Sequence, residues 1–213
     1  MLLALVIGAG LAFAWARRFV QDDAFISFRY AEHFAHGQGL TWNVGEPPIE
    51  GFTNMLFVLL LAAAIRLGSD PIVASAAIGL VSFVLSLLAT HKIAEGLLAS
   101  RPLALACTLI VATNASFAAY ATGGLETQLT TAFVMWALAF SLTEKKQPVL
   151  FAVASVLAVW TRLDAALLLA PAAVMLARDL ARERAWPKLG ASALVSVVGV
   201  GALLAIKMRV FGE

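Results

Sequence analysis

Long uncharged apolar stretches recur along nearly the whole chain, and they restrict its fold more than any other feature of the sequence. The hydrocarbon core of a bilayer is about 30 Å thick, and a helix needs about 20 mostly apolar residues to cross it. The composition agrees, since 62% of the 213 residues are hydrophobic, 13% are charged, and the mean hydropathy is +0.90. These values lie outside the range of ordinary soluble domains. We therefore expect an all-α, polytopic bundle of transmembrane helices.

Seven stretches are interpreted as spans on this criterion, over residues 1–16, 71–90, 102–122, 126–142, 148–162, 165–180 and 189–208. Between the first two lies a polar segment, and it is followed by the apolar residues 52–67, which are short for a span and suit a helix lying along the membrane surface. We expect residues 1–213 to form one transmembrane domain. Residues 17–70 form the loop after its first span, with amphipathic helices at the interface.

Basic residues indicate the orientation of such a bundle, because Lys and Arg accumulate in cytoplasmic loops. In this chain they fall in alternate loops, as Lys92 and Arg101, then Lys145 and Lys146, then Arg178, Arg182, Arg184 and Lys188. These loops are expected to be cytoplasmic. The residues alone leave the side of the 17–51 loop open, because it depends on whether residues 52–67 cross the membrane or lie on it.

The adjacent carboxylates of Asp22 and Asp23 are the strongest catalytic candidates. On a helix, Asp23 lies on the same side as Ser27 and Tyr30, whereas Asp22 lies nearer Arg29, so the two point in different directions. A partly desolvated carboxylate can take a proton from an acceptor hydroxyl, and its neighbour can orient a sugar or hold a cation. The alternative is structural, since Asp is a preferred N-cap residue.

The loop after this predicted helix carries groups that suit a sugar. Trp42 offers a flat apolar face to sugar C–H groups, and Glu50 and Asn54 offer directed hydrogen bonds. Thr53 and Asn54 equally fit ordinary interface polarity. Composition does not separate the two interpretations.

Two later turns contain ionisable residues near membrane depth, where such groups are costly and usually have partners or functions. Glu126 follows a Gly-Gly pair, and Arg162 and Asp164 lie in a Thr-Arg-Leu-Asp turn. The guanidinium of Arg162 has the right shape for a lipid phosphate. Helix capping and a local ion pair explain the same residues equally well. The His and Cys residues have no metal-ligand spacing, which leaves metal binding undetermined.

Three blocks of these residues occur in an order that resembles a known family. They are Asp22-Asp23-Ala-Phe-Ile-Ser-Phe-Arg-Tyr-Ala, Gly39-Leu-Thr-Trp-Asn-Val-Gly-Glu and Glu50-Gly-Phe-Thr-Asn. Together they resemble the N-terminal signature of bacterial C-type (GT-C) glycosyltransferases related to the mycobacterial arabinofuranosyltransferases. Gly124-Leu-Glu-Thr and Thr161-Arg-Leu-Asp extend the resemblance more weakly.

The resemblance implies a membrane glycosyltransferase that moves a pentose or hexose from a polyprenyl-phosphate donor. The acceptor would be an envelope glycan, lipid or protein on the periplasmic side, and nucleic acid would not be a partner. It further implies a multi-pass protein of the bacterial inner membrane with a cytoplasmic N-terminus, in which residues 17–70 are the first periplasmic loop. Such enzymes usually have more spans, so the chain also resembles an N-terminal fragment of a GT-C-like module.

For the site, the resemblance implies that Asp22 and Asp23 are catalytic, Asp23 by preference deprotonating the acceptor. The expected substrate-binding residues are Arg29, Tyr30, Trp42, Glu50, Asn54, Glu126, Arg162 and Asp164. Positive charge on the leaving phosphate would come from Arg29, Arg162 or a divalent cation, and the metal is left undetermined.

Two other functions remain open from the residues. In a transporter of envelope precursors, the same ionisable residues would line a pathway at membrane depth. In a non-catalytic membrane assembly protein, the fold would be kept while the acidic pair caps a helix.

Overall fold

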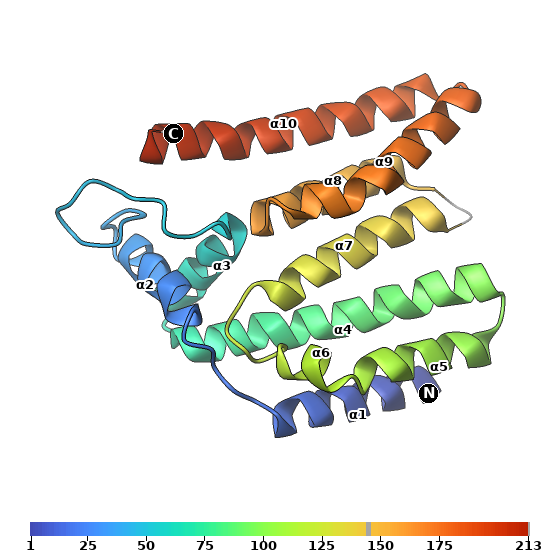
Figure 1. The fold of residues 1–213 in the computed structure, drawn as a ribbon, viewed down its shortest axis with the longest axis horizontal. Helices are drawn as coiled ribbons and strands as arrows, with labels where there is room; N and C mark the ends of the chain where they lie inside the picture. The colour runs from blue at the N-terminus through green and yellow to red at the C-terminus, as the bar shows by residue number, and fades with distance from the viewer. Residues whose placement is uncertain (144–145, 213) are drawn as a thin grey trace.

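The computed structural model describes residues 1–143 and 146–212, and this part of the chain is all-α, with ten helices packed into a compact bundle. The longer helices run roughly side by side, and α2, α3 and the loop between them gather at one end (Figure 1). In chain order the helices are α1 (Leu2–Ala16), α2 (Ala24–Ala35), α3 (Met55–Arg66), α4 (Pro71–Leu98), α5 (Arg101–Ala112), α6 (Ala115–Ala119), α7 (Thr127–Leu142), α8 (Pro148–Thr161), α9 (Ala165–Arg182) and α10 (Trp186–Phe211).

The predicted seven-span architecture is wrong. Among the described residues, α4 and α10 are the two helices long and apolar enough to cross a membrane. The other apolar helices, α1, α3, α5, α7 and α8, have 12 to 16 residues, which at about 1.5 Å per residue is shorter than a bilayer core of about 30 Å. The apolar runs pack against one another instead.

The two long helices differ in their surroundings. In the most apolar window of α4, 44% of the residues are buried inside the molecule, whereas the corresponding share of α10 is 6%. A core helix of a soluble protein meets the same length and composition conditions as α4. These two helices therefore say little about membrane insertion. Lys145, one of the basic loop residues, lies outside the described residues.

Local signals explain where several helices begin. Proline occupies the first turn of α4, α5, α8 and α10, where its missing N–H costs no helical hydrogen bond. The carboxylate of Asp70 accepts hydrogen bonds from the amides of Ile72 and Val73, at 2.8 and 3.2 Å, and so caps α4. The predicted helix over 102–122 is interrupted at Thr113, where Asn114 caps the short α6.

Helices α2 and α3 pack together and build the end of the molecule that holds the site. Tyr30 of α2 and Met55, Phe57 and Leu61 of α3 are all 0% exposed and belong to one apolar cluster. Leu203 of α10 joins the same cluster. The side of α2 that carries Phe28, Tyr30 and Ala31 is thus buried against α3.

The segment before α2 crosses the loop before α7. The amide of Gln21 donates to the carbonyl of Gly123 at 3.0 Å. Gly124 follows with φ +80°, a backbone conformation that favours glycine, and a Cβ at this position would lie 2.7 Å from the Cβ of Ala24. This close crossing holds the start of α2 against the loop that carries Glu126.

Candidate functional site

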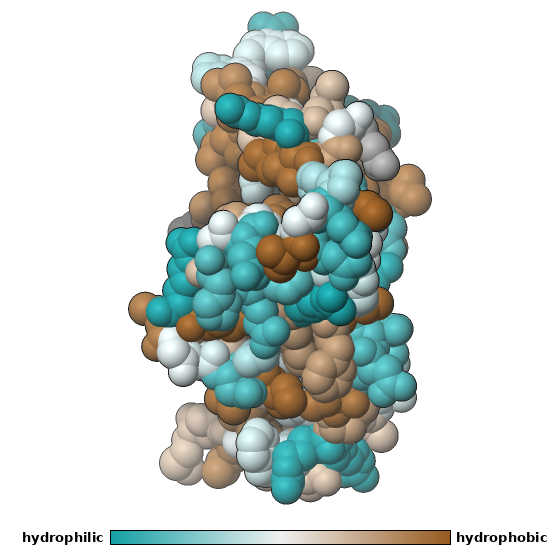
Figure 2. Space-filling view, turned by 90° about the vertical axis from the view of Figure 1, so that its left-hand side faces the viewer, coloured by the Kyte–Doolittle hydropathy of each residue, from teal (hydrophilic) through white to brown (hydrophobic). Residues whose placement is uncertain are grey.

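An open hollow of about 800 Å³ lies where α2, the segment before α3, the loop before α7, the turn after α8 and the end of α10 meet. Hydrophilic residues gather across the middle of this end of the molecule (Figure 2). The polar residues that line the hollow are Asp23, Ser27, Glu50, Thr53, Asn54, Glu126, Arg162 and Lys207. Five of the ten sequence-predicted site residues are among them.

The two aspartates of the predicted catalytic pair lie in different places. Both are exposed, but Asp23 lines the hollow and Asp22 does not. Asp23 occupies the N-cap position of α2, but its side chain makes no capping hydrogen bond within the described part of the chain. The structural interpretation of this pair as a helix cap is therefore not supported for Asp23, whose carboxylate borders the hollow.

A buried chain of hydrogen bonds forms one wall of the hollow. The side-chain amide of Asn54 donates to Ser27 Oγ at 2.9 Å and to Glu126 Oε2 at 2.7 Å. Asn54 and Glu126 are 5% and 7% exposed. A buried carboxylate is tolerated when it accepts such bonds, and this contact joins α2, α3 and the start of α7.

Arg162 connects this wall to the turn after α8. Its Nη1 lies 3.1 Å from Glu126 Oε1, and its Nε and Nη2 donate to the two carboxylate oxygens of Asp164 at 3.0 and 2.9 Å. The hydrogen bond to Asp164 raises the pKa of Arg162, and the Arg162 guanidinium lowers the pKa of Asp164. The ion pair predicted for this turn is present, and Arg162 also reaches the hollow.

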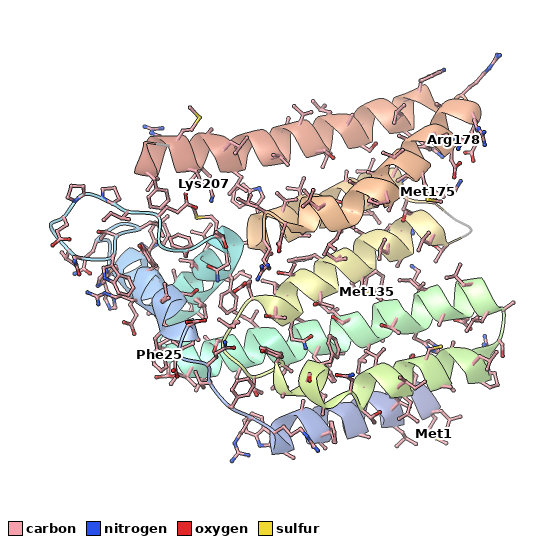
Figure 3. All side chains as sticks on the ribbon, in the orientation of Figure 1. Met1, Phe25, Met135, Met175, Arg178 and Lys207 are labelled. Carbon is pink, nitrogen blue, oxygen red and sulfur yellow. The ribbon has the colours of Figure 1, made fainter. Side chains whose placement is uncertain are left out.

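Lys207 is a site residue that the sequence analysis missed. It extends from α10 toward the loop between α2 and α3, as Figure 3 shows, and its Nζ forms an ion pair with Glu50. The two side chains are only 11% and 15% exposed. Lys207 directly follows an uncharged run over residues 189–206, and an ionisable side chain at such a position usually has a partner, which is the signal that could have identified it.

Tyr30 holds the backbone on both sides of Glu50. Its hydroxyl donates to the carbonyl of Ile49 at 2.6 Å and accepts from the amide of Gly51 at 3.1 Å, so it joins the two residues that flank Glu50. A Cβ on Gly51 would come within 2.7 Å of this hydroxyl oxygen. Tyr30 itself is fully buried and does not line the hollow.

Arg29 and Trp42 lie outside the hollow. Arg29 Nε donates to the carbonyl of Trp42 at 2.8 Å, Nη2 donates to Asn43 Oδ1 at 2.9 Å, and the guanidinium lies 4.3 Å from the centre of the Trp42 ring. Trp42 borders a small neighbouring cavity of about 260 Å³ with Tyr30 and Ile49, and Ile26 and Gly51 line both this cavity and the hollow. Arg29 therefore stabilises the loop, and the structure does not bring it to Asp23.

The sequence left metal binding at the site undetermined. Across residues 1–143 and 146–212, no group of three or more His, Cys, Asp or Glu side chains is arranged to hold a metal ion. The cationic groups at the hollow are Arg162 and Lys207.

Comparison with known proteins gives no match: no family model, no curated protein and no solved structure matches the chain. The fold and the hollow define an all-α protein with a polar, ion-paired site at one end of its helix bundle. Its function is inferred from the chemistry of that site.

Proposed function

We propose that the chain is a glycosyltransferase that moves a pentose or hexose from a polyprenyl-phosphate donor to an envelope glycan, lipid or protein. It works at the bacterial inner membrane and on its periplasmic side. One observation carries the proposal: a single hollow gathers a carboxylate without a capping bond, Asp23, and two cations, Arg162 and Lys207. The resemblance of the blocks around Asp23, Trp42 and Glu50 to GT-C enzymes supports the same chemistry.

The reaction is a displacement at the anomeric carbon of the donor sugar. Asp23 takes the proton of the acceptor hydroxyl, whose oxygen forms the new bond to that carbon. The bond between the carbon and the phosphate oxygen breaks, and the polyprenyl phosphate leaves with its negative charge. Arg162 and Lys207 stabilise that charge, because cations placed where charge develops lower the barrier.

Both cations are already held in place by carboxylates, and this has two consequences. Glu126 and Asp164 orient the guanidinium of Arg162, and Glu50 orients Lys207. A side chain fixed in this way loses little freedom when a phosphate binds. The same pairing is also what a non-catalytic assembly protein would show, and this observation keeps that function as the second candidate.

The test compares Asp23→Asn with Asp22→Asn, a matched neighbour that does not line the hollow. Each variant is expressed in membranes and supplied with polyprenyl-phosphate pentoses and hexoses, and the released polyprenyl phosphate is measured. The envelope material already in the membranes supplies the acceptor, so its structure need not be known. Loss of a general base is expected to slow the reaction by about 10²–10⁴-fold in Asp23→Asn, and Asp22→Asn should stay near wild type.

The proposal fails if the wild type releases no polyprenyl phosphate from any of these donors, or if Asp23→Asn works as well as the wild type. In either case the assembly function becomes the better explanation. The melting temperature of each variant is measured in detergent, so that unfolding is not mistaken for a loss of catalysis.

A further inference from the structure

A second cavity, lined mostly by apolar side chains, lies between the end of α1 and the beginning of α4. We propose that this groove binds an acyl chain of an anionic phospholipid, with the phosphate of the headgroup at Arg18. The proposal does not rest on the glycosyltransferase reaction, because the groove and the hollow have different linings.

The size and the lining of the groove suit an alkyl chain. Its volume is about 470 Å³, within the range of about 300–1,000 Å³ typical of small-molecule sites. Trp15 and Phe19 form one wall, and Val73, Ala76 and Leu80 of α4 form the other. Trp15 is 52% exposed and Val73 is 63% exposed. These apolar surfaces gain free energy when a hydrocarbon chain covers them.

Charge selects the headgroup. Arg18 lines the groove together with Thr122, and none of the ion pairs among the described residues includes Arg18. Its guanidinium lies 5.2 Å from the centre of the Trp15 ring, and its Nη1 donates to the carbonyl of Trp15 at 3.3 Å, so the other guanidinium nitrogens are the ones that face a phosphate in this proposal. Arg18 thus remains as a cation for a phosphate.

The groove lies next to the segment that carries the acidic pair. The amide of Phe19 donates to Thr122 Oγ1 at 3.4 Å, and the amide of Gln21 donates to the carbonyl of Gly123. A lipid seated against Phe19 and Thr122 stabilises this crossing from the groove side. Hydrophobic surface is also exposed at this end of the molecule below the hydrophilic band, toward α1 (Figure 2).

The test uses phosphatidylglycerol and phosphatidylcholine that carry the same brominated acyl chains, because bromine quenches a tryptophan that it contacts. The purified protein in a nonionic detergent is titrated with each lipid. The fluorescence of Trp15 is isolated as the difference between the wild type and Trp15→Phe. Arg18→Gln removes the headgroup cation, Ala76→Phe fills the groove, and Arg101→Gln, an exposed arginine with its own partner Glu95, is the matched control.

The proposal expects quenching of Trp15 that saturates at a lower fraction of phosphatidylglycerol than of phosphatidylcholine. Arg18→Gln should weaken the apparent affinity for phosphatidylglycerol about fivefold, Arg101→Gln should leave it unchanged, and Ala76→Phe should abolish the saturable phase. Equal quenching by the two lipids in the wild type would overturn the proposal. An unchanged affinity for phosphatidylglycerol in Arg18→Gln would also overturn it. Because Arg18→Gln changes only a surface side chain, this test can still be made if Ala76→Phe does not fold.

Discussion

Breaking the ion pair between Lys207 and Glu50 is expected to destabilise the protein. Lys207→Met leaves the Glu50 carboxylate unpaired where it is 15% exposed, and Glu50→Gln leaves the ammonium unpaired where it is 11% exposed. Removing one member of a buried pair costs about 3–5 kcal/mol, and the lower end applies here because the pair borders an open hollow. For a chain of this length, a loss of about 3 kcal/mol lowers the melting temperature by about 6–12 °C.

The double variant Lys207→Met, Glu50→Gln separates the pair from its surroundings. With both charges gone, neither group is left buried and unpaired, so the double variant should recover about 2 kcal/mol relative to the sum of the two single losses. Thermal unfolding of all four proteins is followed by far-ultraviolet circular dichroism in the same detergent. Strictly additive losses would refute the reasoning, because they would mean that Lys207 and Glu50 do not interact.

Two further predictions concern the turn after α8 and the close approach of α4. Asp164→Asn should cost roughly 0.5 kcal/mol at neutral pH, because Arg162 and Asp164 are both largely exposed to solvent. The folded-state pKa of Asp164 is lowered by Arg162. The stability difference between wild type and Asp164→Asn should therefore be fully present above the ordinary Asp pKa of about 3.9 and vanish as the pH falls through the lowered value. A stability difference that does not depend on pH would contradict this. Gly79→Ala should cost about 1–3 kcal/mol, because its Cβ would lie 2.2 Å from the carbonyl oxygen of Ala121. Gly8→Ala, with nothing within 4 Å of its Cβ, should be neutral or stabilising in the same melting experiment.

Helix positions followed from local signals in the sequence. The predicted ranges 148–162 and 165–180 correspond to α8 (Pro148–Thr161) and α9 (Ala165–Arg182), and the amphipathic pattern after Asp23 corresponds to α2. Proline, aspartate and asparagine near helix starts act within a few residues of the chain, so their effect is visible without a tertiary structure. The number of spans was not predictable in this way. An apolar stretch has the same composition whether it crosses a membrane or packs in a helix bundle, and the lengths of the helices within these stretches are set by where the folded chain turns.

The site residues were likewise predicted only in part from the sequence. Blocks of polar residues identified Asp23, Glu50, Asn54, Glu126 and Arg162, which the structure brings to one hollow. Asp23 lines the hollow and Asp22 does not, and this difference depends on how the start of α2 packs against the loop before α7. That packing arises from contacts between segments about 100 residues apart.

What the sequence by itself determined is the helical character of the chain, most helix ends and the residue types available for chemistry, because these depend on neighbours along the chain. Only the tertiary structure decided that Lys207, 157 residues from Glu50, completes the site, and that Arg29 and Trp42 stabilise a loop outside it. The physical reason is that a buried charge is tolerated where folding supplies a partner, and the partner is chosen by helix packing rather than by distance along the chain.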